Sequence, residues 1–215
     1  RSTRKESSAA SMCIRDSNNC FLTTNTMIHL NELYLILNKS LKWNKSHLKC
    51  FALIMLVIIL KQTCNLSSAS KALPIKCLPQ SFYRRMQRFF AGQYFDYRQI
   101  SQLIFNMFSF DQVQLTLDRT NWKWGKRNIN ILMLAIVYRG IAIPILWTLL
   151  NKRGNSDTKE RIALIQRFIA IFGKDRIVNV FADREFIGEQ WFTWLIEQDI
   201  NFCIRVKKTS LSPII

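Results

Sequence analysis

Histidine is nearly absent from this chain, and its scarcity excludes several kinds of active site. The 215 residues contain only 2 histidines, His29 and His47, so no Ser-His-Asp triad can be assembled around a convincing base. The chain also lacks Gly-x-Gly-x-x-Gly and Gly-Lys-Ser/Thr sequences, which excludes the common dinucleotide and phosphate loops. A catalytic site here must use other groups.

Paired cysteines are also missing, although the chain contains 6 cysteines. They are Cys13, Cys20, Cys50, Cys64, Cys77 and Cys203. No two of them form a Cys-x-x-Cys pair, which argues against a zinc site. Scattered thiols without a signal peptide favour a reducing, cytoplasmic location.

No apolar run is long enough to cross a membrane. The longest is FALIMLVIIL, from Phe51 to Leu60, and Lys49 and Lys61 flank it. A spanning helix needs about 20 apolar residues, so this run predicts a buried helix, with a membrane anchor as the weaker alternative.

Acidic residues are scarce: 14 stand against 31 lysines and arginines, a formal net charge of +17. Between Leu33 and Gln99 the one acid is Asp96. The cations of that block are Lys39, Lys42, Lys45, Lys49, Lys61, Lys71, Lys76, Arg84, Arg85, Arg88 and Arg98. Such a block favours nucleic acid as partner over an anionic membrane or a generic basic surface, because clustered like charges repel without a polyanion.

Helical periodicity dominates residues 27–110. The segment QSFYRRMQRFF, residues 80–90, is amphipathic, and Arg84, Arg85 and Arg88 lie off its apolar stripe. Helices with this charge predict a DNA-binding domain containing a helix-turn-helix element. Residues 1–26 have no periodicity and are interpreted as a disordered or non-native tail.

After Phe110 the pattern changes to that of a mixed α/β layer. The predicted order is strand, strand, strand, helix, strand, helix, strand, at residues 113–118, 129–138, 141–150, 157–173, 176–183, 187–198 and 202–208. Gly140 should turn a hairpin, and Pro144 fits an edge strand or bulge. Asp157 can cap the first of these helices and Gly173 can end it.

Two of the predicted strands run into an aspartate followed by an arginine. One ends at Asp118-Arg119 and the other at Asp183-Arg184-Glu185. Functional groups gather at strand ends in α/β sheets, and two carboxylates there can share Mg²⁺ or Mn²⁺ ions for phosphoryl transfer. The alternative is that each Asp-Arg pair only caps a strand or forms a surface ion pair.

Long segments of the chain resemble bacterial insertion-sequence transposases of the DDE class, IS-four type. They are LDRTNWKWGKRNINILMLAIVYRGIAIPILWTLLNKRGNSDTKERIALIQRF and ADREFIGEQWFTWLI, with SFYRRMQRFF further upstream. The resemblance implies a ribonuclease-H-like mixed sheet with flanking helices behind an all-α DNA-binding domain. It also implies cut-and-paste transposition with Mg²⁺ at the terminal inverted repeats of double-stranded DNA. Homodimerisation and association with the bacterial nucleoid are further expectations.

The resemblance assigns roles to individual residues. Asp118 and Asp183 match the first two catalytic, metal-binding acids, and Arg184 and Glu185 complete the second motif. The residues expected to contact DNA are Arg84, Arg85, Arg88, Arg119, Lys123, Lys126, Arg127 and Arg184. Trp122 and Trp124 are alternative base-stacking groups. The expected divisions are a tail at 1–26, a helical DNA-binding domain at 27–110 and a partial DDE core at 111–215.

The third acid of this family is a glutamate in a Tyr-x2-Arg-x3-Glu-x6-Lys signature, and that signature is missing here. Glu189 and Glu197 stand in the wrong context, and the terminal SLSPII departs from the family pattern. We therefore expect an inactive transposase fragment. The alternatives are a truncated DNA-binding protein that occupies transposon ends, or another ribonuclease-H-like nuclease.

Overall fold

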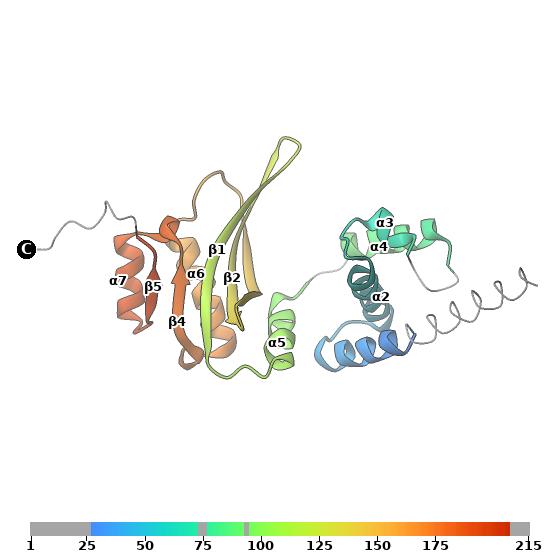
Figure 1. Ribbon diagram of the computed structural model, residues 1–215, viewed down its shortest axis with the longest axis horizontal. Coiled ribbons are helices and arrows are strands. Elements are labelled where there is room, and N and C mark those ends of the chain that lie inside the picture. The colour runs from blue at the N-terminus through green and yellow to red at the C-terminus, as the bar shows by residue number, and fades with distance from the viewer. Residues whose placement is uncertain (1–26, 73–76, 93–94, 207–215) are drawn as a thin grey trace, which may run out of the picture. The chain divides into compact units, whose positions relative to one another are not determined.

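The structure is a computed structural model that describes residues 27–72, 77–92 and 95–206. The chain divides between Phe95 and Asp96 into a helical unit and a unit built on a β-sheet (Figure 1). The tail expected at residues 1–26 and the C-terminal SLSPII lie outside the described residues.

The helical unit consists of helices, and capping side chains mark the starts of α2 and α3. A first helix covers residues 27–40, followed by α2 (Lys45–Lys61), α3 (Leu66–Ser70) and α4 (Pro79–Gly92). The side chain of Asn44 accepts from the backbone of His47, and that of Asn65 accepts from two backbone N–H groups of α3. The three helices α2, α3 and α4 pack against one another.

The apolar run in α2 is largely buried, as predicted, except at its end, where Ile59 and Leu60 are exposed. Leu53, Ile54 and Val57 of α2 join Phe82 and Met86 of α4 in the core of this unit. Burial of one face of α4 leaves its polar residues on the other face, the arrangement expected for an amphipathic helix. Within the described residues, no helix is long and apolar enough to span a bilayer.

Helix α5 (Tyr97–Met107) packs with the sheet, although the sequence analysis grouped it with the helical region. The Ser101 hydroxyl donates to the carbonyl of Ile145 at 2.7 Å, and the Tyr97 ring meets the edge of Trp147. The division of the chain therefore falls before α5 rather than at the expected residue 110.

The sheet has five strands in the order β3-β2-β1-β4-β5. Its strands are β1 (Val113–Trp124), β2 (Arg127–Tyr138), β3 (Ile141–Leu150), β4 (Ile177–Ala182) and β5 (Phe202–Ile204). The first three are antiparallel, and β4 and β5 run parallel to β1. With α6 (Thr158–Phe172) before β4 and α7 (Glu189–Glu197) after it, this is the ribonuclease-H-like order, and the predicted fold class is confirmed.

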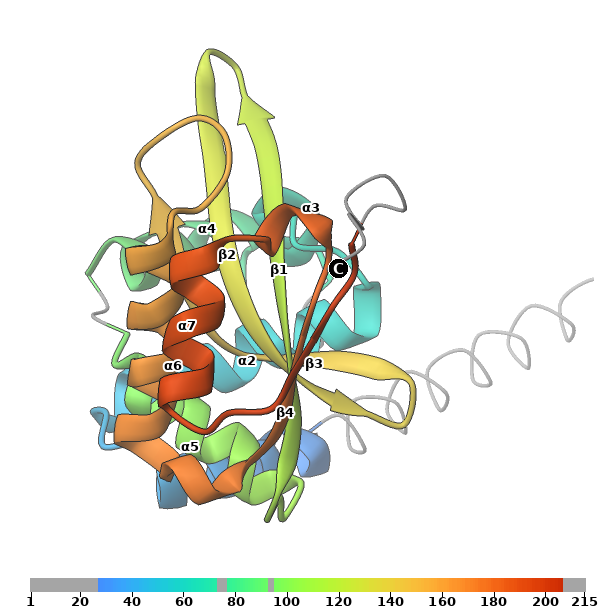
Figure 2. The same ribbon diagram turned by 90° about the vertical axis from the view of Figure 1, so that its left-hand side faces the viewer.

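The core lies between one face of the sheet and the helices α6 and α7 (Figures 1 and 2). Leu115 and Leu117 of β1 are fully buried in it, together with Phe168 of α6 and Trp191 of α7. Since side chains alternate along a strand, Asp118 must point to the opposite face from Leu117.

Strand β1 does not end at Asp118, and that prediction was wrong. It continues to Trp124, because Trp122 pairs with Ile129 and a tight turn at Gly125, with φ +57°, returns the chain into β2. The hairpin at Gly140 is confirmed, as are the edge position of β3 and the bulge beside Pro144.

Asp157 caps helix α6, as the sequence predicted, and the structure adds a complete capping box with Glu160. The Asp157 carboxylate accepts from the backbone of Glu160 at 2.9 Å, and the Glu160 carboxylate accepts from the backbone of Asp157 at 2.8 Å. The hydrogen bond from the Glu160 backbone and the nearby Lys152 ammonium lower the pKa of Asp157 below its ordinary value of 3.8.

We expect this cap to make the sheet unit sensitive to acid. Because the folded-state pKa of Asp157 is lowered, its contribution is present above pH 3.8 and is lost as the pH falls through the folded value. Asp157→Ala should lower the free energy of unfolding in urea by about 1 kcal/mol at pH 7. Asp157→Asn, which keeps a capping oxygen, is the control; an Ala variant as stable as the Asn variant would contradict the assignment.

Candidate metal centre and nucleic-acid surfaces

Asp118 lies on β1 and Asp183 directly follows the neighbouring strand β4, at the end of the sheet where β4 finishes. Leu117 of β1 pairs with Ala182, the last residue of the parallel strand β4, so the two aspartates follow the last registered pair. Neighbouring strands are about 4.8 Å apart, and registered residues of parallel strands point to the same face. Both aspartates are exposed. Their carboxylates can therefore approach one cation from two strands.

A third carboxylate does not join this pair among the described residues. No cluster of three His, Cys, Asp or Glu side chains suited to a metal is found there. Glu185, two residues after Asp183, is the nearest acid in sequence, but its carboxylate accepts from Arg119 Nε at 3.2 Å and Nη2 at 2.9 Å. This pairing holds Glu185 in place and explains why it does not complete a triad.

The Arg119 guanidinium is an internal clamp, which does not support its predicted role as a phosphate contact. Besides Glu185, it donates to the side-chain carbonyls of Asn130, at 3.4 Å, and Asn155, at 3.2 Å. The side chain of Arg119 is 13% exposed and that of Glu185 26%. Asn130 in turn donates to the backbone carbonyls of Lys152 and Gly154. Strand β1, strand β2 and the loop before α6 are thus tied to the turn after β4.

Arg161 of α6 also holds the turn after β4 in place. It is buried on the apolar face of α6 and donates to the carbonyl of Glu185 at 3.1 Å and to the carbonyl of Ser156 at 2.6 Å. Burial lowers the pKa of the Arg161 guanidinium, against the opposing influence of the Glu185 charge. The sequence analysis missed this residue. Its signal was an arginine in line with the buried positions Leu164 and Phe168.

The basic residues near Asp118 occupy the hairpin of β1 and β2. Lys123, Lys126 and Arg127 are all exposed at its tip, and Arg184 is exposed directly beside Asp183. Because Arg127 pairs with Trp124, strand alternation places Arg127 on the face of Asp118 and Lys123 on the opposite face. Of the expected cations, Arg127 therefore shares the face of Asp118 and Arg184 adjoins Asp183, whereas Lys123 points to the opposite face.

Residues 109–211 match the family model described as "Transposase DDE domain". This part of the chain is a transposase DDE domain. No curated protein matches the chain. Asp118 and Asp183 both lie within the matched residues, and the match bears out the DDE class of transposase expected from the sequence.

Viral proteins are among the solved structures similar to the chain. They include the HTLV-2 integrase catalytic core domain in complex with magnesium, at 14% identity and a TM-score of 0.35, over 44% of this chain and 61% of that one. The intasome of simian T-cell lymphotropic virus with the PP2A regulatory subunit B56 gamma matches at 14% identity and a TM-score of 0.36, over 47% and 37%. The chain thus spans less than two thirds of each.

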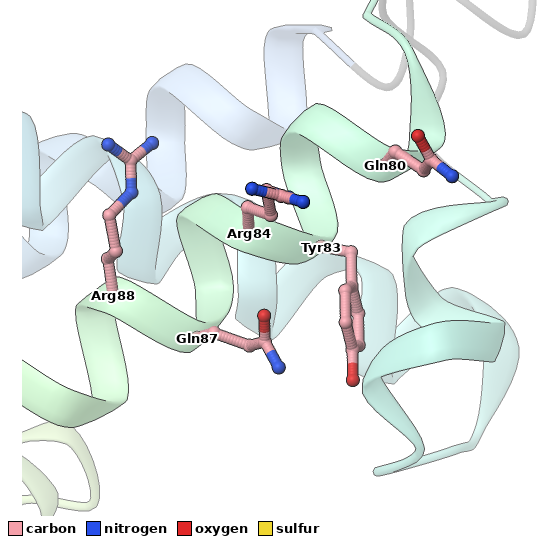
Figure 3. A pocket seen from close by; sticks show the side chains of 5 residues that line it. All are labelled: Gln80, Tyr83, Arg84, Gln87 and Arg88. Atoms are coloured by element: carbon pink, nitrogen blue, oxygen red, sulfur yellow. The ribbon is translucent and has the colours of Figure 1, made fainter.

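Outside the DDE domain, α4 presents the predicted arginines of the helical unit. A hollow of about 630 Å³ follows its polar face (Figure 3). The residues that line it are Gln80, Tyr83, Arg84, Gln87 and Arg88. Arg84 and Arg88 are exposed, whereas Arg85 is half-buried beside Cys50, whose pKa burial raises. The three arginines therefore differ: two face solvent, and one is partly internal.

The clamp in the DDE domain should show strong coupling between Arg119 and Glu185. Arg119→Met and Glu185→Gln should each lower the free energy of unfolding by about 1.5–3 kcal/mol, since each leaves a half-buried partner without its charge-assisted bonds. The double variant should cost clearly less than the two single losses together. Arg153→Met, an exposed change in the nearby loop, is the control; additive losses would show that the pair is not coupled.

Proposed function

We propose that the chain carries the DNA-binding and metal-binding parts of a cut-and-paste DNA transposase, with Asp118 and Asp183 as the first two catalytic acids. The observation that carries this proposal is the register of β1 with β4, which sets both carboxylates side by side within a DDE domain. Carboxylate oxygens are the ligands that Mg²⁺ and Mn²⁺ prefer. The exposed pair fits such an ion as two of its protein ligands.

The residues around the pair have separable roles in this proposal. Asp118 and Asp183 hold the cation, and Arg184 and Arg127 bind phosphates of the transposon end on either side of it. The Arg119–Glu185 clamp positions the turn that carries Asp183. A divalent cation at the site supplies positive charge that activates an attacking hydroxyl and stabilises the leaving oxygen in phosphoryl transfer.

This polypeptide alone is proposed to bind DNA without cutting it. Within residues 95–206 that the structure describes, two carboxylates stand where the DDE chemistry uses three, and Glu185 is bound to Arg119. Binding without cleavage matches a protein that occupies the terminal inverted repeats and blocks an intact transposase.

The helical unit is proposed to supply the affinity for duplex DNA. From residue 27 to residue 95 its one acid, Glu32, stands against a set of lysines and arginines. Arg84 and Arg88 project from α4 beside Gln80 and Gln87, and arginine and glutamine are the side chains that most often contact guanine and adenine edges or phosphates. The packing of α2, α3 and α4 suits a helix presented to a groove.

Metal binding tests the proposed site directly. We expect Mn²⁺ to bind the full chain, and Asp118→Asn or Asp183→Asn to weaken that binding at least tenfold, because each removes one charged ligand. Titration followed by electron paramagnetic resonance measures the free Mn²⁺. Asp175→Asn, an exposed aspartate on the turn before β4, is the control and should bind as the native chain does.

The same preparations decide whether the chain cleaves DNA. With Mg²⁺ and a supercoiled plasmid, we expect no nicking above the level of Asp118→Asn. Nicking that disappears in Asp118→Asn would contradict the proposed inactivity while supporting the acid's catalytic role. Loss of Mn²⁺ binding in the Asp175 variant alone would overturn the site itself.

Duplex binding should depend steeply on salt. Each phosphate contact releases counterions, so Arg84→Ala and Arg88→Ala should each reduce the slope of log affinity against log salt by about 0.9. Arg139→Asn is the control, because it removes one cation from the β2–β3 turn, at the sheet end away from Asp118. Asparagine also tolerates the left-handed backbone of this position. Fluorescence anisotropy with a labelled duplex measures the slopes. An equal slope in all variants would exclude α4 as a phosphate-binding surface.

A further inference from the structure

The tip of the β1–β2 hairpin forms a two-stranded ribbon beyond the rest of the sheet (Figures 1 and 2). Strand β4 ends its pairing with β1 at Leu117, and β3 ends its pairing with β2 at Asn130. Residues 122–129 therefore pair only with each other. A ribbon without a third strand has no core of its own to bury large apolar side chains.

Trp122 is nevertheless exposed on this ribbon. Trp122 is 61% exposed, and it is the largest aromatic residue among the exposed hydrophobic residues of the described chain. Four other tryptophans, Trp43, Trp147, Trp191 and Trp194, each pack against another aromatic ring. Trp122 has no such ring contact within the described residues. A large indole left in water at a protruding tip indicates a surface for a partner.

The surroundings of Trp122 select the kind of partner. Lys123, Lys126 and Arg127 are exposed next to it, with no acid between Arg119 and Arg139. Such a cluster attracts a polyanion and repels a second basic chain, whose net charge would also be +17. An aromatic face among cations is the combination that binds the bases and phosphates of an exposed nucleic-acid strand.

The position of Trp122 connects it to the two aspartates. Asp118, Thr120 and Trp122 point to the same face of β1, because every second residue of a strand does so. Arg127 shares that face on β2. Trp122 is four positions beyond Asp118, or about 13 Å along the strand. A DNA strand whose phosphate lies at the aspartates can therefore reach the indole within a few nucleotides.

We propose that Trp122 stacks against an unpaired base of the DNA strand held at Asp118 and Asp183, while Arg127 binds a neighbouring phosphate. The inference rests on the proposed function and adds a contact for the strand next to the reacting phosphate. Bases inside an intact duplex are already stacked on each other. Trp122 thus favours DNA whose strand is unpaired near the point of attack.

The test uses the full chain with three probes: a blunt duplex, the same duplex with a short unpaired thymine overhang, and the overhang strand alone. Trp122→Leu keeps apolar surface and removes the aromatic face, whereas Trp122→Phe keeps a ring. Trp122→Leu should weaken binding to the overhang duplex about tenfold to hundredfold, and Trp122→Phe should weaken it less. Blunt-duplex affinity should stay within about twofold in both variants, because phosphate contacts dominate it.

A second measurement separates stacking from charge. Trp122→Leu should leave the salt slope of overhang binding unchanged, whereas Arg127→Gln should reduce it by about 0.9. Overhang affinity equal in the native chain and Trp122→Leu would overturn the proposal, as would a change in self-association by sedimentation without a change in DNA binding. In both cases DNA binding itself persists and the proposed function stands. A native chain that binds none of the probes would overturn both.

Discussion

The parallel pairing of β1 with β4 is the contact on which the candidate site depends. It joins residues far apart in sequence, and its last pair, Leu117 with Ala182, sets Asp118 beside Asp183. A slip of one residue would turn one carboxylate toward α6 and α7, because side chains alternate along a strand. The buried leucines of β1 prevent that slip, since Leu115 and Leu117 are fully enclosed on the core face. The core thus determines where the carboxylates point.

A second set of contacts holds the turn that carries Asp183. Arg119 and Arg161 both donate hydrogen bonds to Glu185: Arg119 to its carboxylate and Arg161 to its backbone carbonyl. Half-buried ion pairs add little net stability compared with apolar packing, but they fix geometry once formed. The consequence is an arrangement in which positive charge lies behind the two acids and Glu185 is unavailable as a ligand. The exposed cations of the hairpin remain free to face a polyanion.

Local features of the fold could be read from the sequence, and contacts between distant residues could not. The N-cap at Asp157 and the turn at Gly140 depend on a few neighbouring residues, and both were predicted. The end of β1 was misjudged, because Asp118, Arg119 and Asn121 resemble a turn until cross-strand pairing with β2 overrides that preference. The Arg119–Glu185 pair spans 66 residues, and only the register of β1 with β4 brings it together. The two acids were predicted because their Asp-Arg motifs and the family resemblance pointed to the same positions.

The most direct test of the account is a crystal structure of the chain soaked with Mn²⁺, located by anomalous scattering. We expect an anomalous peak about 2 Å from a carboxylate oxygen of Asp118 and of Asp183, with the Glu185 carboxylate still bound to Arg119. A peak coordinated elsewhere, or Glu185 released from Arg119 while Asp118 binds no ion, would contradict the proposed site.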